Sequence, residues 1–167
     1  MAGSLEGKAI LVTGGGSGIG RATSLLLARQ GAKIMIADYV PDGAMKTVSM
    51  IKEAGGTADC IAADVSVTKQ VEMMVAKTVE TFGRIDGAFN NAGIEGRMGT
   101  DTATAAEENF DRTIAINLKG VWLCMKYEIP QMLKQGGAPL SIPLRSPASS
   151  ALKADQPTTP RSTELSV

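Results

Sequence analysis

The stretch KAILVTGGGSGIGRATSLLLARQGAKIMIAD, residues 8–38, decides the fold. Its first part, Lys8–Thr13, is a short apolar run beside glycines, which is typical of a buried parallel strand. A helical pattern over Ile19–Gln30 follows and ends before Gly31, and Lys33–Asp38 reads as a second strand. Four residues mark the helical spacing: Ile19, Ala22, Leu26 and Arg29. This order of elements predicts a βαβ unit with parallel strands.

The same alternation continues through most of the chain. It predicts further helices and strands at Asp42–Ala54, Ala58–Ala62, Thr68–Phe82, Ile85–Asn90 and Ala105–Leu133. Two apolar stripes mark the longer helices: Val71, Met74, Val75, Val79 and Phe82 in one, and Phe110, Ile114, Leu118, Val121, Met125 and Met132 in the other. We therefore expect an α/β fold, a Rossmann-type doubly wound parallel sheet covered by helices on both faces. The expected sheet ends after the fourth strand and the long helix that follows it.

The composition changes at Gly137. All 19 glycines lie at or before Gly137, whereas five of the seven prolines follow Ala138. The remaining segment is rich in Ser, Thr and Pro and shows neither a strand period nor a helix period. Proline at this density removes backbone donors and interrupts helices. We expect one incomplete domain over residues 1–136 and a disordered tail over residues 137–167.

The charge balance gives no sign of a polyanionic partner. The chain has 17 Lys plus Arg and 17 Asp plus Glu, so its formal net charge is zero. We expect no nucleic-acid partner, no membrane partner and no metal site. Cys60 and Cys124 lie in apolar stretches and are expected to be buried free thiols of a reducing compartment. Because Met1–Lys8 has no apolar core for a signal peptide, we predict a cytoplasmic protein.

The turn after the first strand reads Thr13-Gly14-Gly15-Gly16-Ser17-Gly18-Ile19-Gly20. A dinucleotide needs a tight turn, a close approach of the backbone to its pyrophosphate, and a helix N-terminus aimed at it. Gly14, Gly18 and Gly20 meet these needs, and the loop lies between a strand and a helix, as that function requires. A P-loop would need Lys followed by Ser or Thr, whereas this chain has Arg21-Ala22. Residues 1–136 are therefore interpreted as an incomplete NAD(P)-binding domain.

Asp38 ends the second predicted strand, 18 residues after Gly20. A carboxylate at this place accepts hydrogen bonds from the adenosine ribose hydroxyls and repels a 2′-phosphate. The alternative is an ordinary turn residue at a strand end. Arg21 is interpreted as a solvated side chain or one that bonds to the backbone, not as a phosphate receptor. The predicted cofactor is therefore NAD rather than NADP.

The spacing Thr-Gly-x-x-x-Gly-x-Gly at Thr13–Gly20 resembles the short-chain dehydrogenase/reductase family. Three further motifs resemble it in order: Asp64-Val65, Asn90-Asn91-Ala92-Gly93 and Asn117. The resemblance implies that the first pair flanks the adenine, that the second motif steadies the sheet beside the cofactor, and that Asn117 holds a water in the proton relay. Without it, Asn90 and Asn91 read as turn formers and Asn117 as a helix residue bonded to the backbone.

Loop, strand end and resemblance together define a predicted site. The candidate cofactor-binding residues are Gly14, Ser17, Gly18, Ile19, Gly20, Asp38, Asp64, Val65, Asn90, Ala92 and Gly93. Asn117 is the candidate catalytic residue.

The rest of the catalytic centre that the resemblance implies is missing from the sequence. The family passes hydride between a nicotinamide and an alcohol or ketone carbon, with a tyrosine as general acid/base, a lysine four residues later and a serine. An unperturbed tyrosine, with a pKa near ~10, is a poor base at neutral pH, which is why the lysine is needed. No tyrosine follows Tyr127. We expect the full-length parent to be a homo-oligomer that acts on a small-molecule alcohol or ketone, and this chain to be inactive.

A shifted reading frame would explain the composition of residues 137–167. Back-translation of residues 137–167, read one base earlier with free choice of third bases, permits the peptide AIVNTSSVAGLIGPESGPAYNASKHGVIG. That peptide resembles the missing segment, because an apolar strand ends in Ser-Ser and a Tyr-x-x-x-Lys follows. We hypothesise that the tail is an out-of-frame reading that starts near Gly136–Pro139.

The missing segment has a structural consequence. Without a fifth strand, Ile85–Asn90 would present an open apolar edge, which favours aggregation. The alternatives to a frameshifted enzyme are a short non-catalytic isoform that binds NAD or a partner, and a product that does not fold. An unrelated fold with a glycine loop, such as a methyltransferase, would not explain Asn90–Gly93.

Overall fold

The computed structural model of the chain describes residues 3–96, 101–136 and 141–143. Within these ranges, five parallel strands form one sheet in the order β3–β2–β1–β4–β5. The strands are β1 (Ala9–Thr13), β2 (Lys33–Asp38), β3 (Thr57–Ala62), β4 (Gly87–Asn90) and β5 (Ser141–Pro143). The helices are α1 (Gly18–Arg29), α2 (Pro41–Glu53), α3 (Thr68–Phe82), α4 (Glu107–Ile114) and α5 (Val121–Lys134), with a π-helical segment, η1 (Ala115–Gly120), between the last two.

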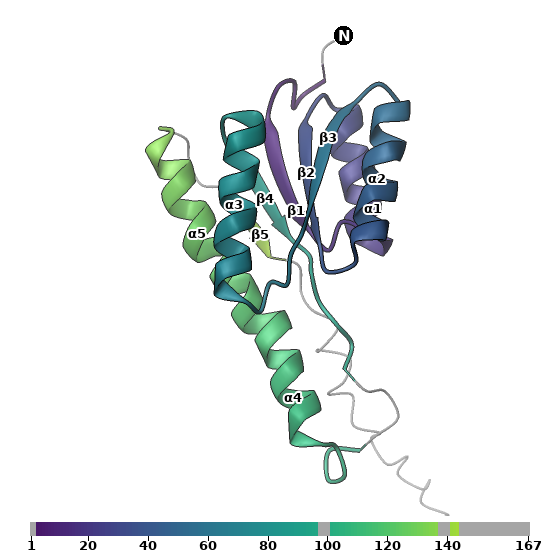
Figure 1. Cartoon of the computed structure of the whole chain (residues 1–167), viewed down its shortest axis with the longest axis vertical. Coiled ribbons are helices and arrows are strands. Elements are labelled where there is room, and N and C mark those ends of the chain that lie inside the picture. Colours follow the sequence, from purple (N-terminus) through teal and green to yellow (C-terminus); the bar gives the residue numbers. More distant parts are fainter. Residues whose placement is uncertain (1–2, 97–100, 137–140, 144–167) are drawn as a thin grey trace, which may run out of the picture.

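Helices cover both faces of the sheet, so the predicted doubly wound α/β class is confirmed. Helices α1 and α2 lie over one face, and α3 and α5 lie over the other (Figure 1). On the first face, Val48 and Ile51 of α2 pack against Ile34 and Ile36 of β2. The central strands β1 and β2 are buried on both faces, as expected for parallel strands between two helical layers.

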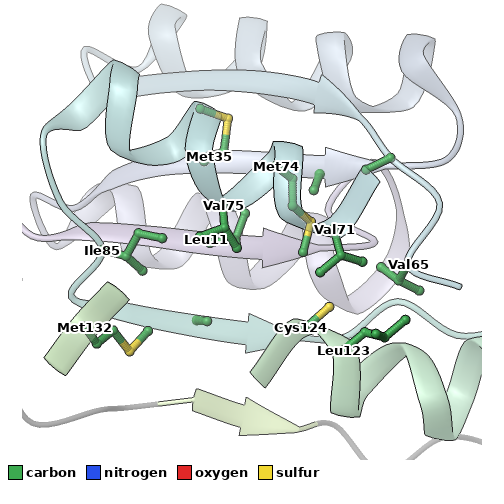
Figure 2. Packing of buried hydrophobic residues seen from close by; sticks show 13 residues of the cluster. Leu11, Met35, Val65, Val71, Met74, Val75, Ile85, Leu123, Cys124 and Met132 are labelled. Carbon is green, nitrogen blue, oxygen red and sulfur yellow. The ribbon is translucent and has the colours of Figure 1, made fainter. Parts of the chain in front are cut away.

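The second core lies under α3 and α5. Leu11 of β1 and Met35 of β2 face Val71 and Met74 of α3, and Leu123 of α5 joins the same cluster (Figure 2). All five side chains are at most 2% exposed. The apolar stripe that the sequence assigned to residues 68–82 is therefore the face that α3 turns toward the sheet, as predicted.

The stripe assigned to α1 is wrong. Ile19 and Leu26 are 61% and 57% exposed, and Ala22 is exposed as well. The helix instead turns Gly20 and Ser24 inward, where the Ser24 hydroxyl donates to the Gly20 carbonyl at 2.8 Å. Small residues let α1 approach the sheet closely, and Leu25, Leu27 and Ala28 pack against the core beside them. The buried face of α1 therefore lies at other positions than the predicted stripe.

A fifth strand covers part of the edge that we expected to be open. Ser141–Pro143 pairs in parallel with β4 over Ala88–Asn90. The Gln135 amide continues this edge, because it accepts from the Ile85 N–H at 3.0 Å and donates to the Ile85 carbonyl at 2.9 Å. The expectation of an open edge along the fourth strand is therefore wrong over Ala88–Asn90. The rest of the predicted disordered tail, residues 137–140 and 144–167, lies outside the described residues.

The predicted long helix is present but changes character along its length. Helices α4 and α5 join through η1 into one helical run, and α4 extends beyond the end of the sheet (Figure 1). Of the predicted stripe, Phe110 and Leu118 are 63% and 65% exposed and Met132 is buried, whereas the buried residues Leu123 and Cys124 lie outside the stripe. The apolar stripe thus reaches the core only where α5 lies over the sheet.

Both cysteines are free thiols. Cys124 is buried as predicted, whereas Cys60 is only half-buried. Burial and the nearby Glu128 carboxylate raise the pKa of the Cys124 thiol far above its ordinary value. Among the described residues, no helix has the length and apolar character to cross a membrane.

Candidate nucleotide-binding site

A pocket of about 560 Å³ opens at the carboxyl ends of the strands. It lies beside β1 and β4, which are neighbours in the sheet although β2 and β3 come between them in the sequence. Such a switch point is where open α/β sheets bind ligands. The lining residues are Gly14, Ser17, Gly18, Ile19, Asp38, Tyr39, Val40, Ala63, Asp64, Val65, Asn91, Ala92, Gly93, Ile94, Glu95, Arg112, Ile116 and Asn117.

The glycine loop forms one wall of this pocket. Gly14 has φ +63°, and a Cβ there would lie 2.9 Å from the Ala92 Cα, so the turn after β1 touches the turn after β4. Gly18 has φ +48°, and a Cβ there would meet no heavy atom within 4 Å. At Gly14 a side chain is therefore disfavoured both by the positive φ and by the backbone of Ala92. At Gly18 it is disfavoured by the positive φ alone.

The N-terminus of α1 faces the same space. Ser17 is the N-cap in an extended conformation, and its side chain makes no capping hydrogen bond. The first N–H groups of α1 are thus not occupied by the side-chain cap that usually satisfies them. Gly20 does not line the pocket. It packs against the turn after β1, where a Cβ on Gly20 would lie 2.1 Å from the Gly14 carbonyl oxygen.

Asp38 stands at the end of β2 and is held by the backbone. Its Oδ2 accepts from the Gly16 N–H at 2.8 Å, and its Oδ1 accepts from the Val40 N–H at 2.9 Å. A carboxylate offers about four acceptor positions, so two remain for a ligand in the pocket. The side chain is only half-buried, which leaves this face of the carboxylate open to that ligand.

Asp64 and Val65 form the wall that follows β3. Asp64 caps its own turn, because its Oδ1 accepts from the Ser66 N–H at 2.8 Å and from the Ser66 hydroxyl at 2.6 Å. Val65 is buried against η1, where a Cβ on Gly120 would lie 2.8 Å from the Val65 Cγ2. The pair therefore lines the pocket through a braced turn.

The Asn-Asn-Ala-Gly motif divides into two roles. Asn91, Ala92 and Gly93 line the pocket, and the Asn91 amide donates to the carbonyls of Thr13 and Gly14 at 3.1 Å each. The predicted site residue Asn90 does not line it. Asn90 is 1% exposed, and its Nδ2 donates to the Glu128 carboxylate at 2.9 Å. Side chains alternate along a strand and its extension, so neighbouring asparagines point in opposite directions.

Asn117 lies in η1 on the opposite wall. Its Oδ1 accepts from the Ile94 N–H at 2.9 Å, and its Nδ2 donates to the Ile94 carbonyl at 2.8 Å. The side chain thus bonds to backbone, but to the connection after β4 rather than to its own helix. Short π-helical segments occur frequently at functional sites, and this one brings Ile116 and Asn117 to the pocket.

Ten of the twelve predicted site residues line this pocket, and Gly20 and Asn90 lie behind it. The structure adds Asn91, which the sequence analysis named in a motif but not as a site residue, and seven further lining residues: Tyr39, Val40, Ala63, Ile94, Glu95, Arg112 and Ile116. Tyr39, Val40 and Ala63 adjoin motif residues and follow strand ends, which was a usable signal. Arg112, on α4, carried no local signal because the course of the long helix decides where it lies.

Comparison with known proteins defines the class. A sequence profile of the family described as short chain dehydrogenase matches residues 8–141. The chain therefore belongs to the short-chain dehydrogenase family.

Individual relatives agree with this assignment. An uncharacterized oxidoreductase of Thermotoga maritima is 47% identical over 134 residues, which cover 80% of this chain and 52% of that protein. Levodione reductase of Leifsonia aquatica is 46% identical over 132 residues, which cover 77% of this chain and 49% of that protein. A crystal structure of levodione reductase matches with TM-score 0.79 and 37% identity, and the match covers 88% of this chain and 61% of the other. NAD⁺-bound xylitol dehydrogenase matches with TM-score 0.78 and 33% identity, covering 83% and 53%. The chain spans about half the length of the curated relatives it matches.

Proposed function

We propose that this chain is the NAD-binding part of a short-chain dehydrogenase. The observation that carries the proposal is Asp38: a carboxylate that stands at the pocket wall, held by two backbone N–H groups with acceptor positions left over. Ribose hydroxyls are donors that suit these positions, and a 2′-phosphate would face a negative charge. The NAD⁺-bound structure of xylitol dehydrogenase, which shares this fold, supports a nicotinamide cofactor.

The residues around the pocket fit such a cofactor. Gly18 leaves open space in the loop, and the N-terminus of α1 provides N–H groups for a pyrophosphate. Asp38 would hold the adenosine ribose, Asp64 and Val65 would flank the adenine, and Ala92 and Gly93 would lie beside the rest of the nucleotide. Arg112 is the single basic residue among the lining residues, and it comes from α4 rather than from the strand end that carries Asp38. This charge distribution favours NAD over NADP.

The proposed reaction of the whole enzyme is hydride transfer with an alcohol or ketone of a small molecule. Bound NAD would supply the hydride acceptor, or NADH the donor. Of the catalytic groups that the family resemblance implies, Asn117 alone lies among the described residues, and its bonds to Ile94 fix the wall next to the reaction space. We propose that the serine, tyrosine and lysine are encoded in the shifted frame, that the parent is a cytoplasmic homo-oligomer, and that this chain binds NAD without turnover.

Nucleotide titration tests the binding step. The full chain is titrated with NAD and with NADP by calorimetry, beside Asp38→Asn, which keeps the shape but removes the charge. Loss of charge-assisted hydrogen bonds should weaken NAD binding by about 10-fold or more and leave NADP binding unchanged or stronger. Asp42→Asn is the matched control, because Asp42 is exposed on the first turn of α2. Equal affinities of Asp38→Asn and the unchanged chain for NAD would overturn this assignment.

DNA sequencing tests the reaction. If one base is surplus near the codons for Gly136–Pro139, the frame-restored gene should encode an enzyme that oxidises secondary alcohols with NAD. If genomic DNA and transcript both carry the frame as written, the alternative function remains, a non-catalytic module that binds NAD or a protein partner. A thermal shift with NAD then separates this module from a product that does not fold, because a ligand stabilises only a folded site.

A further inference from the structure

Behind the glycine loop lies a polar network that the cofactor site does not itself include. Arg21 on the first turn of α1 reaches across to α2, where its Nε donates to the Thr47 hydroxyl at 3.0 Å. Its Nη2 donates to the Gly16 carbonyl, and it lies 3.4 Å from the Gly43 carbonyl oxygen. The guanidinium thus serves acceptors on the loop and on α2, and the prediction that Arg21 bonds to backbone is confirmed.

Thr47 is the second member of this network. It is completely buried, and its hydroxyl oxygen lies 2.9 Å from the Gly15 carbonyl oxygen and 3.1 Å from the Gly43 carbonyl oxygen. A hydroxyl has one proton and two acceptor lone pairs, so Thr47 donates to one of these carbonyls while it accepts from Arg21. The shorter contact, to Gly15, belongs to the loop rather than to the helix of Thr47.

The loop and α2 are in close contact at this point. A Cβ on Gly43 would lie 3.0 Å from the Gly16 carbonyl oxygen, and a Cβ on Gly16 would lie 2.7 Å from the Asp38 Oδ2. There is therefore no room for a side chain at Gly16 or Gly43 between the loop, α2 and Asp38. Arg21 and Thr47 are the side chains that donate to the loop carbonyls of Gly16 and Gly15.

One planar peptide connects this network to the cofactor site. The Gly15 carbonyl and the Gly16 N–H belong to the same peptide group, whose two ends point in opposite directions in a trans peptide. Thr47 holds the carbonyl end, and Asp38 accepts from the N–H end at 2.8 Å. Rotation of this peptide would break both hydrogen bonds together. In the same way, Arg21 holds the Gly16 carbonyl and thereby fixes the direction of the Ser17 N–H at the start of α1.

We propose that Thr47 and Arg21 are positioning residues of the nucleotide site: by holding the carbonyls of Gly15 and Gly16, they fix the Gly16 N–H against Asp38 and so set the preference for NAD over NADP. The inference rests on the proposed NAD function. It is also consistent with Arg21 not acting as a receptor for a 2′-phosphate, because its donors are directed at Gly16, Gly43 and Thr47 and it does not line the pocket.

Three variants of the full chain test the proposal. Thr47→Val keeps the shape of the side chain but removes the hydroxyl, Thr47→Ser keeps the hydroxyl and is the matched control, and Arg21→Met keeps the aliphatic bulk without donors. Calorimetry gives the dissociation constants for NAD and NADP. Each variant loses a hydrogen bond that orients the loop, which contributes about as much as one ordinary hydrogen bond. Thr47→Val and Arg21→Met should therefore each weaken NAD binding by about 10-fold. The dissociation constant for NADP should change less than that for NAD, because NADP gains nothing from Asp38. The constant for NADP divided by the constant for NAD should therefore fall.

A second readout separates a positioning role from a merely structural one. Hydrogen exchange of the Gly16 N–H in the nucleotide-free chain should become faster in Thr47→Val and stay slow in Thr47→Ser, while the exchange of amides in β2 stays unchanged. A loss of thermal stability with an unchanged ratio of NAD to NADP affinity and unchanged exchange at Gly16 would overturn the inference. If the unchanged chain binds neither nucleotide, the proposed function fails, and exchange at Gly16 still decides whether Thr47 holds the loop.

Discussion

On one side of β1, strands β2 and β3 pair over six positions, whereas on the other side β4 and β5 pair over three. The first half, with α1 and α2, carries the glycine loop and Asp38. The hydrogen bonds of Arg21 and Thr47 behind this loop lie within residues 15–47, and Asn91 also donates to the carbonyls of Thr13 and Gly14. In the second half, β4 depends on α5, through Glu128 and Gln135. The support behind the glycine loop is therefore mostly local in sequence, whereas Asn90 and Ile85 bond to groups that are 38 and 50 positions away.

The two halves also differ in how their helices lie relative to the sheet. Helices α1 and α2 lie along it, whereas α4 extends past its end (Figure 1). Large apolar side chains are exposed in both halves, among them Leu26 on α1 and Phe110 on α4. Strand β1 pairs with β4, so neither half is complete without the other. We expect the stability of the second half to be more sensitive to single long-range contacts, because Asn90 and Ile85 bond to groups that are 38 and 50 positions away.

The largest effect is expected at the close contact behind the glycine loop. Gly20→Ala adds a Cβ 2.1 Å from the Gly14 carbonyl oxygen, so either the loop or α1 must shift. We expect a loss of about 3 kcal/mol in the free energy of unfolding, measured by urea titration, together with loss of NAD binding. Alanine is the better helix former by about 1 kcal/mol, so the exposed control Ala22→Gly should cost only about that amount. A stabilising Gly20→Ala would show that the first half is less tightly closed than its geometry indicates.

The second prediction concerns the buried pair in the other half. Glu128 is 0% exposed and its Oε2 accepts from the Asn90 amide at 2.9 Å. Glu128→Ala removes this acceptor and leaves a cavity, so we expect a loss of about 2–3 kcal/mol in urea unfolding. Glu128→Gln retains an acceptor oxygen and should cost less. If both variants match the unchanged chain, β4 does not depend on α5 as the comparison requires.

Asp86 links the two halves, because its carboxylate accepts from the Ala9 N–H of β1 at 2.9 Å and pairs with Arg84 at 2.6 Å. Partial burial raises the pKa of Asp86. The hydrogen bonds from Ala9 and Arg84 and the charges of Arg84 and Lys8 together lower that pKa by more, so the net shift is downward. A carboxyl with a lowered folded-state pKa adds stability above its ordinary pKa and loses it as the pH falls through the folded-state value.

This linkage is measured by urea unfolding between neutral pH and pH 3. The unchanged chain should lose stability toward low pH more steeply than Asp86→Asn. At neutral pH the variant should cost about 1 kcal/mol, since Arg84 and Lys8 are about half exposed and such pairs contribute little. Parallel curves for the two proteins would show that Asp86 does not couple the halves.

The smallest effect on stability is expected on the exposed stripe of the second half. Leu118→Lys replaces a side chain that is 65% exposed, so the free energy of unfolding should change by less than about 0.5 kcal/mol. Light scattering of concentrated protein should nevertheless fall, because the variant removes exposed apolar surface. Lys119→Leu, beside it and also exposed, is the reverse control and should increase scattering.

The local elements and most of the site could be predicted from the sequence. The order of strands and helices, the glycine loop, Asp38 and the motif at Asn90–Gly93 all follow from residues that are adjacent or nearly so. These features depend on backbone preferences and short spacing, which a single stretch of sequence contains. The strand order within the sheet, β3–β2–β1–β4–β5, was not among the predictions, because it depends on which strands pair after folding.

Other features depended on which distant segments meet. The inward face of α1, the bond from Asn117 to Ile94, the burial of Glu128 against Asn90 and the brace formed by Arg21 and Thr47 join residues that no local pattern relates. A hydrophobic period gives the spacing of a stripe, but packing decides whether that stripe meets the sheet or solvent, as Leu26 and Leu118 show. The sequence by itself therefore determined the elements as far as α5 and the chemical groups of the site. The tertiary structure alone decided the partners of those groups, because folding brings together the pairs of residues that form hydrogen bonds and bury each other.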